Sequence, residues 1–217
     1  MFRIAASVGF PGAIFILAIL SSVFVFMTTV LPMIDGRGWP PHMDHLEMLL
    51  PHIAGGVSMI LFGACALYLG WNRRGLRWHR WLGRTYILGG LVASVLVIVM
   101  AFRVEHEPQS LYVATGTLAV AWVAVTAMGW RAARNRRFDS HREWMIRSYV
   151  LSWTFVGCRL ATMVDFYPWL GAESVTTAIW VNWIVPLIVC EMALRWKEGA
   201  RMERRIRIAR PAGVGDG

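Results

Sequence analysis

The segment Arg77-Trp78-His79-Arg80-Trp81-Leu82-Gly83-Arg84-Thr85-Tyr86 is the stretch that decides the fold. It returns in altered form as His141-Arg142-Glu143-Trp144-Met145-Ile146-Arg147-Ser148-Tyr149. The pattern Trp-x-x-Arg-(Thr/Ser)-Tyr therefore occurs twice, 63 residues apart, and a long apolar run follows each copy. A repeat of this kind predicts two copies of one helical unit.

The composition around this repeat is that of a membrane protein. The chain has 217 residues, of which 57% are hydrophobic and only 16% charged, and its mean hydropathy is +0.50. Soluble domains contain about 25% charged residues, whereas several apolar runs here reach the roughly 20 residues that cross a bilayer. We predict an all-α, polytopic membrane protein with one membrane domain, residues 1–196, and a basic tail, residues 197–217.

Six apolar runs are long enough to be membrane spans. They lie at about 9–31, 51–70, 83–103, 111–130, 144–163 and 175–196. The formal charge of +9 resembles that of a nucleic-acid-binding protein, but Arg and Lys gather in alternate loops and in the tail. This distribution obeys the positive-inside rule, which places both termini in the cytoplasm and argues against a nucleic-acid partner. The basic face favours contact with anionic lipids.

The repeat pairs spans two and three with spans four and five. Both copies begin and end on the same side, so they are related by an axis along the membrane normal. This relation predicts a central four-helix bundle with spans one and six packed outside it. Small residues that allow close helix packing support the prediction in spans two and three. They are Gly55, Gly56, Ser58, Gly63, Ala64, Ala66, Gly89, Gly90, Ala93 and Ser94.

Four features make the chain resemble a family of bacterial predicted membrane proteins known as domain of unknown function 2306. They are His52 with Gly55-Gly56, the segment 79–86, the segment 141–149 with Arg159-Leu160, and Trp183 with Glu191. The resemblance covers about residues 50–195 and implies a multi-pass protein of the bacterial inner membrane. Before the glutamate, Trp183 is followed by Ile-Val-Pro, where the family usually has Val-Pro-Asn. A helical bundle with paired histidines is also similar to transmembrane b-type cytochromes, an analogy of fold alone.

The histidines form two pairs of matching depth. His79 and His141 lie at the cytoplasmic face, and His52 and His106 lie at the opposite face. Ligation of haem b by two imidazoles needs equal depth on facing helices, so each pair is a candidate haem site. The register is an objection, because His79 stands two residues before its tryptophan and His141 three, which is about 100° of helix rotation. The alternative is that these side chains only meet lipid headgroups at the helix ends.

Four ionisable residues lie within or just inside the apolar spans. Arg84, Arg147, Arg159 and Glu191 are there, and such residues usually have partners. The depth of Glu191 matches those of Arg84 and Arg147, so we predict a structural ion pair, for which Arg147 is the chosen partner. The functional alternative is that Arg84, Arg147 and Arg159 bind an anionic group, such as a haem propionate, a lipid headgroup or a substrate.

A weaker candidate is a metal site formed by His42, His45 and His52 in the first loop and at the start of span two. Imidazoles can hold zinc or copper, but the spacing matches no known ligand motif, and an ordinary polar loop is the alternative. No nucleophile elbow, phosphate loop or metalloprotease motif is present. No residue is therefore assigned as catalytic, and any activity would be that of a membrane-bound oxidoreductase.

Three functions remain open from the sequence. The first is haem-b electron transfer across the membrane, with quinone or another redox partner. The second is transport or binding of a small anionic or lipid-like molecule, favoured by the parallel repeat and the intramembrane charges. The third is a scaffold without catalysis.

Overall fold

The computed structural model describes residues 9–35, 45–103, 108–164 and 168–209. All regular structure in these ranges is helical. The helices are α2 (Phe10–Val25), the π-helical η1 (Phe26–Val30), α3 (Leu31–Ile34), α5 (Leu46–Trp71), α6 (Leu76–Ala101), α7 (Gln109–Arg134), α8 (Phe138–Ser152), α9 (Thr154–Met163), the 3-10 segment η2 (Pro168–Glu173) and α10 (Ser174–Ala209). The prediction of an all-α polytopic membrane protein is confirmed.

Five segments of these helices are long and apolar enough to cross a membrane. They are Gly12–Val30, Leu46–Trp71, Leu76–Met100, Gln109–Arg134 and Ser174–Ala200. The predicted fifth span, 144–163, differs because it is divided between α8 and α9. The break lies at Trp153, whose N–H bonds the carbonyl of Val150 three residues back, so the last turn of α8 tightens before α9 begins.

Two connections are much shorter than the sequence predicted. The basic loops expected at 71–82 and 131–143 are turns of residues 72–75 and 135–137. The Arg- and Trp-rich segments after each turn are helical instead. Long side chains can reach the interface from a helix, and the helical backbone satisfies its own hydrogen bonds. Both histidines of the repeat therefore lie in first helical turns rather than in loops.

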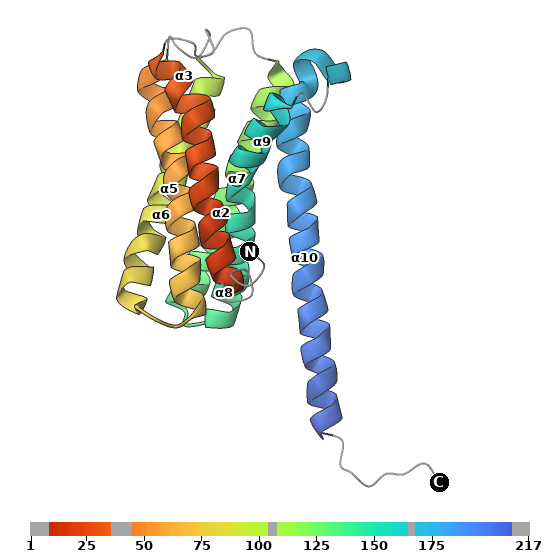
Figure 1. The fold of residues 1–217 in the computed structure, drawn as a ribbon. Helices are drawn as coiled ribbons and strands as arrows, with labels where there is room; N and C mark the ends of the chain where they lie inside the picture. The colour runs from red at the N-terminus through yellow and green to blue at the C-terminus, as the bar shows by residue number, and fades with distance from the viewer. Residues whose placement is uncertain (1–8, 36–44, 104–107, 165–167, 210–217) are drawn as a thin grey trace, which may run out of the picture.

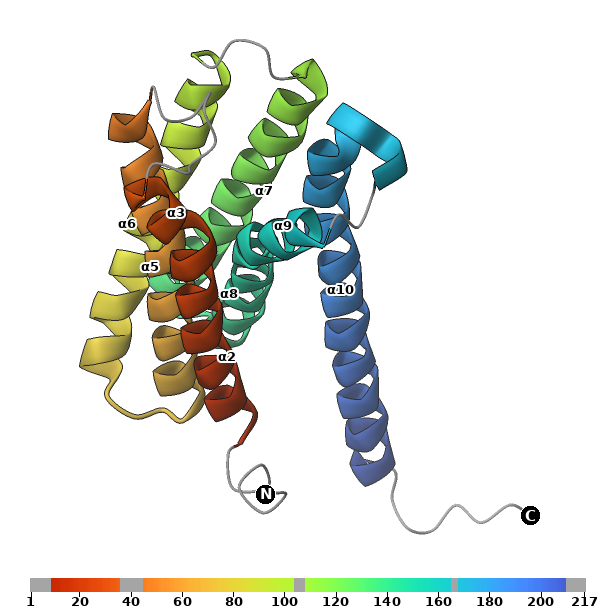
Figure 2. The ribbon, with the colours of Figure 1, turned by 45° about the horizontal axis from the view of Figure 1, so that its top comes forward.

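Helices α5, α6, α7 and α8 form a ring in which each helix packs against the next and α8 closes against α5. Helix α2 packs outside this ring against α5, and α10 packs against α7, α8 and α9. Figures 1 and 2 show α10 standing at the side of the bundle and continuing past the ends of the other helices. The first part of the predicted tail, 197–209, thus extends α10 in line.

Small residues bring α5 and α6 into backbone contact, as the sequence predicted. A β-carbon on Gly55 would lie 2.6 Å from the carbonyl oxygen of Gly89, and one on Gly89 would overlap the hydroxyl of Ser58. Tyr86 and Ile60 have the largest fully buried side chains among the described residues and belong to one buried apolar cluster. A second buried cluster contains Leu49, Ile53 and Met100. We call the end at which the turns 72–75 and 135–137 join the helices the basic end.

Candidate functional site

His79 and His141 occupy equivalent places at the basic end. Each is the fourth residue of its helix, because α6 begins at Leu76 and α8 begins at Phe138. The preceding turns are built alike, with Asn-Arg-Arg at residues 72–74 and again at 135–137. This repeated Asn-Arg-Arg is a second signal in the sequence that marks the two helix starts as equivalent.

The turns also explain why the register mismatch does not separate the two rings. The second turn is one residue shorter than the first, since it lacks a counterpart of Gly75, which adopts a left-handed conformation. Counted from the start of each helix, the two histidines therefore occupy the same position. The one-residue difference falls on Trp81 and Trp144 instead. Trp81 is more than half exposed, whereas Trp144 is half-buried and packs near Gly129.

Both histidines are anchored in the same way. His79 Nδ1 donates a hydrogen bond to the carbonyl of Ala66 at 2.8 Å, and His141 Nδ1 donates one to the carbonyl of Gly129 at 2.9 Å. A carbonyl can only accept, so each ring carries a proton on Nδ1, and Nε2 is the ring nitrogen left to meet a ligand. Gly70 permits this approach in the first copy, because a β-carbon there would lie 3.0 Å from the His79 ring.

The imidazoles of His79 on α6 and His141 on α8 lie close together. Their centroids are 6.2 Å apart and their planes are at 89°. Burial lowers the pKa of the His141 imidazole, the hydrogen bond to Gly129 raises it in part, and the neighbouring His79 lowers it further. His141 is therefore held in its neutral form, which is the form that can ligate a metal.

A pocket of about 280 Å³ contains both rings and is lined by residues of α5, α6, α7 and α8. Tyr86 and Tyr149 line its apolar inner part, with ring centroids 6.5 Å apart. Both tyrosines pack on Gly63, where a β-carbon would lie 2.6 Å from the Tyr149 ring. Three arginines also line the pocket, namely Arg80, Arg84 and Arg134. The pocket thus joins an aromatic interior to cationic side chains.

Beneath the pocket a buried set of polar side chains fixes Tyr86. Its hydroxyl lies 2.6 Å from Ser148 Oγ and 3.0 Å from Ser152 Oγ, and it accepts a hydrogen bond from Trp122 Nε1. Thr126 reaches the other side of Ser148 at 2.6 Å. Because α6, α7 and α8 all contribute to this cluster, it holds the inner wall of the pocket in one arrangement.

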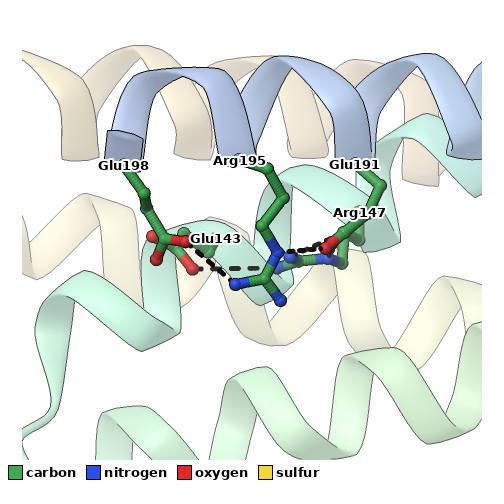
Figure 3. A network of polar contacts seen from close by, with 5 residues as sticks. All are labelled: Glu143, Arg147, Glu191, Arg195 and Glu198. Atoms are coloured by element: carbon green, nitrogen blue, oxygen red, sulfur yellow. Dashed lines mark hydrogen bonds and ion pairs between the residues drawn. The ribbon is translucent and has the colours of Figure 1, made fainter. Parts of the chain in front are cut away.

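Arg147 does not line the histidine pocket and forms an ion pair with Glu191 instead. Its guanidinium contacts Glu191 Oε2 through Nε at 2.8 Å and Nη2 at 2.7 Å, and Glu143 lies 3.9 Å away (Figure 3). Glu191 also accepts a hydrogen bond from Arg195, which in turn pairs with Glu198. This network ties α8 to α10, in agreement with the ion pair expected from depth.

The three arginines considered for an anionic ligand are separated in the structure. Only Arg84 lines the histidine pocket. Arg159 lies in α9 and donates to the carbonyl of Thr28 in the π-helical segment η1, and its Nε is buried without a hydrogen-bond partner among the described residues. Arg80 and Arg134, which do line the pocket, were missed because the sequence placed both of them in loops.

The other histidine candidates are only partly within the described residues. His52 lies on α5, and its Nδ1 donates to the carbonyl of Ala93 at 2.9 Å. Its proposed partner His106 lies outside the described residues, as does His42 of the first-loop set. His45 is 3.9 Å from Glu47. No group of three or more metal-binding side chains occurs in the described part of the chain, so the second haem pair and the first-loop metal site stay predictions.

Comparison with known proteins identifies the family from the region that contains this site. A family model described as predicted membrane protein, DUF2306, matches residues 49–194. The chain belongs to the DUF2306 family. The region matched by the DUF2306 model includes His79, His141, Arg147 and Glu191. Helix α2 and the end of α10 lie outside it. Neither a curated protein nor a solved structure matches the chain.

Proposed function

We propose that this DUF2306 protein binds one haem b between His79 and His141 and serves in membrane electron transfer. The observation that carries the proposal is the pair of neighbouring imidazoles, each with Nδ1 held by a backbone carbonyl. Such outer hydrogen bonds fix the tautomer and ring orientation of metal-ligating histidines.

The donor set fits haem better than a bare metal ion. Structural zinc sites use four protein ligands and catalytic ones three, whereas a six-coordinate haem needs two from the protein. His79 and His141, whose ring centroids are 6.2 Å apart, would be the two protein ligands of the haem.

The rest of the pocket suits the two ends of a haem. The rings of Tyr86 and Tyr149 offer flat apolar contact to a macrocycle, and Arg80, Arg84 and Arg134 could neutralise propionates. At about 280 Å³ the pocket is slightly smaller than the usual organic-ligand sites of about 300–1,000 Å³, so a macrocycle would also use its open side. When bound, haem supplies reversible one-electron transfer. The chain orients the ligands, supplies cationic groups and excludes water from the inner face.

The spectrum of purified protein from haem-supplemented cells tests this proposal. We expect a Soret band and sharp visible bands on reduction. His79→Ala and His141→Ala should each abolish or shift them, and His45→Ala, at the opposite end of the bundle, should leave them unchanged. A colourless preparation without iron would refute the proposal.

A second candidate function uses the same pocket. Three arginines around the two imidazoles favour a small anionic or lipid-like molecule, such as one bearing a carboxylate or phosphate. In that case haem-free protein should be stabilised by a short-chain phosphatidic acid. Arg84→Gln and Arg134→Gln should weaken this stabilisation, and Arg77→Gln, on the outer surface of α6, should not. Absence of both haem and anion binding would favour a scaffold role.

Membrane orientation is also a proposal. We infer that the basic end faces the cytoplasm of a bacterial inner membrane, because the turns and the nearby helix ends carry most of the arginines. The same surface favours anionic lipids.

A further inference from the structure

A second pocket lies back to back with the histidine pocket. It measures about 250 Å³ and shares the side chains of Leu67 and Tyr149 with the first. Its other apolar walls include Ile14 on α2, Val150 on α8 and Leu194 on α10. The histidines do not line it, so this cavity is distinct from the proposed haem site.

The polar lining of this cavity is acidic, although the chain carries a net charge of +9. Asp139, Glu143 and Glu198 line it together with a single arginine, Arg142. That guanidinium already lies 4.0 Å from the centroid of the Trp71 ring, a cation–π contact. Asp139 has no ion-pair partner among the described residues, so it is available to a ligand.

Glu143 and Glu198 each contact an arginine, but neither ion pair is both close and buried. The Glu143 contact to Arg147 is long, at 3.9 Å, and Arg147 is mainly engaged by Glu191. Glu198 pairs with Arg195 at 2.9 Å, but both side chains are about half exposed or more. The carboxylates of the lining can therefore exchange these contacts for a ligand at little cost.

We propose that this second pocket binds an amphipathic small molecule with an apolar body and a head that donates hydrogen bonds. Carboxylates accept hydrogen bonds and attract positive charge, so the head is an amine or a ring hydroxyl and is not a carboxylate or phosphate. The apolar body lies between α2, α8 and α10 against Tyr149. The proposal does not rest on haem binding, because its residues other than Leu67 and Tyr149 belong to this cavity alone.

Four ligands with a common decyl chain separate the possible heads. The purified full chain in lipid nanodiscs is titrated with decylamine, decylhydroquinone, the dimethyl ether of decylhydroquinone, and decanoate, and thermal stabilisation reports binding. We expect decylamine or decylhydroquinone to bind at least tenfold more tightly than the ether and decanoate. Preference for the amine identifies a cationic head, and preference for the hydroquinone identifies a ring hydroxyl. Equal binding of all four, or binding of none, overturns the proposal.

Matched variants locate the site. Asp139→Asn removes the unpaired carboxylate, and Ala193→Phe fills the apolar part of the cavity, which Ala193 lines. Each should weaken the preferred ligand at least fivefold. Glu203→Gln and Ala200→Phe change residues that are exposed on α10 and lie outside the cavity lining, and they should leave the affinity unchanged. Unchanged affinity in both cavity variants would overturn the site assignment. His79→Ala should remove haem without changing this affinity, so failure of one proposal is distinguishable from failure of the other.

Discussion

Replacing Glu191 by alanine tests how strongly the ion-pair network ties α10 to the bundle. The carboxylate meets Arg147 through both Nε and Nη2 and also accepts from Arg195. The Arg147 side chain is only 11% exposed, whereas that of Glu191 is 40% exposed. Removal of Glu191 therefore leaves a mostly buried guanidinium without its main partner.

The expected cost lies between two limits. Breaking a fully buried ion pair by removing one partner costs about 3–5 kcal/mol, and an exposed pair contributes about 0–1 kcal/mol. Glu191 is more than a third exposed, and Arg147 retains Glu143 at 3.9 Å and the ring of Trp144. We therefore expect a loss of about 1–3 kcal/mol, intermediate between these limits. For a chain of this size that corresponds to a fall in Tm of roughly 3–10 °C.

The measurement is thermal unfolding in one detergent, with Glu198→Ala as the matched control. Glu198 lies on the same helix and pairs with Arg195, but the two side chains are 49% and 67% exposed. Its removal should cost at most about 1 kcal/mol. Replacing Arg147 and Glu191 together by leucine should cost less than the sum of the single changes, because no charge is then left unpaired. Equal Tm shifts for Glu191→Ala and Glu198→Ala, or additive single changes, would refute the reasoning.

Three further expectations follow from the fold and the site. A cysteine introduced at Gln109 should react with an impermeant thiol reagent in intact cells and one at Asn135 should not, and the reverse pattern would invert the topology. Gly63→Val should destabilise the protein by about 1–3 kcal/mol because its β-carbon meets a tyrosine ring at 2.6 Å, while Gly116→Val, where a β-carbon meets open space, should cost less. Since burial lowers the pKa of His141, the unfolded chain takes up a proton first on acidification, so stability should fall as pH drops below about 6.5, and this loss should be smaller in His141→Gln.

The fold class and the pairing of charged residues could be predicted from the sequence. Apolar runs of bilayer length predicted an all-α membrane protein, because a backbone in lipid must satisfy its own hydrogen bonds. Depth along the chain also paired Arg147 with Glu191, since a helix rises by a fixed distance per residue. These are one-dimensional properties, and they are preserved when helices rotate or tilt.

Rotation about each helix axis was not fixed in this way. The two histidines looked about 100° out of register when counted from their tryptophans. In the structure they meet, because the turn before α8 is one residue shorter than the turn before α6 and each histidine becomes the fourth residue of its helix. The phase of a helix is set where it begins, and the beginnings were hidden by Arg- and Trp-rich segments that resembled loops.

Partners distant in sequence were decided by tertiary packing alone. Arg159 was a candidate for an anion, yet it bonds a carbonyl of η1, 131 residues away in the chain. Arg80 and Arg134 come together with Arg84 only because α6 and α7 are neighbours in the ring. The sequence determined which segments are apolar enough to cross a membrane and how far along its segment each charged residue lies. Only the packed helices decided which side chains face one another, because that depends on the rotation and spacing of each helix against its neighbours.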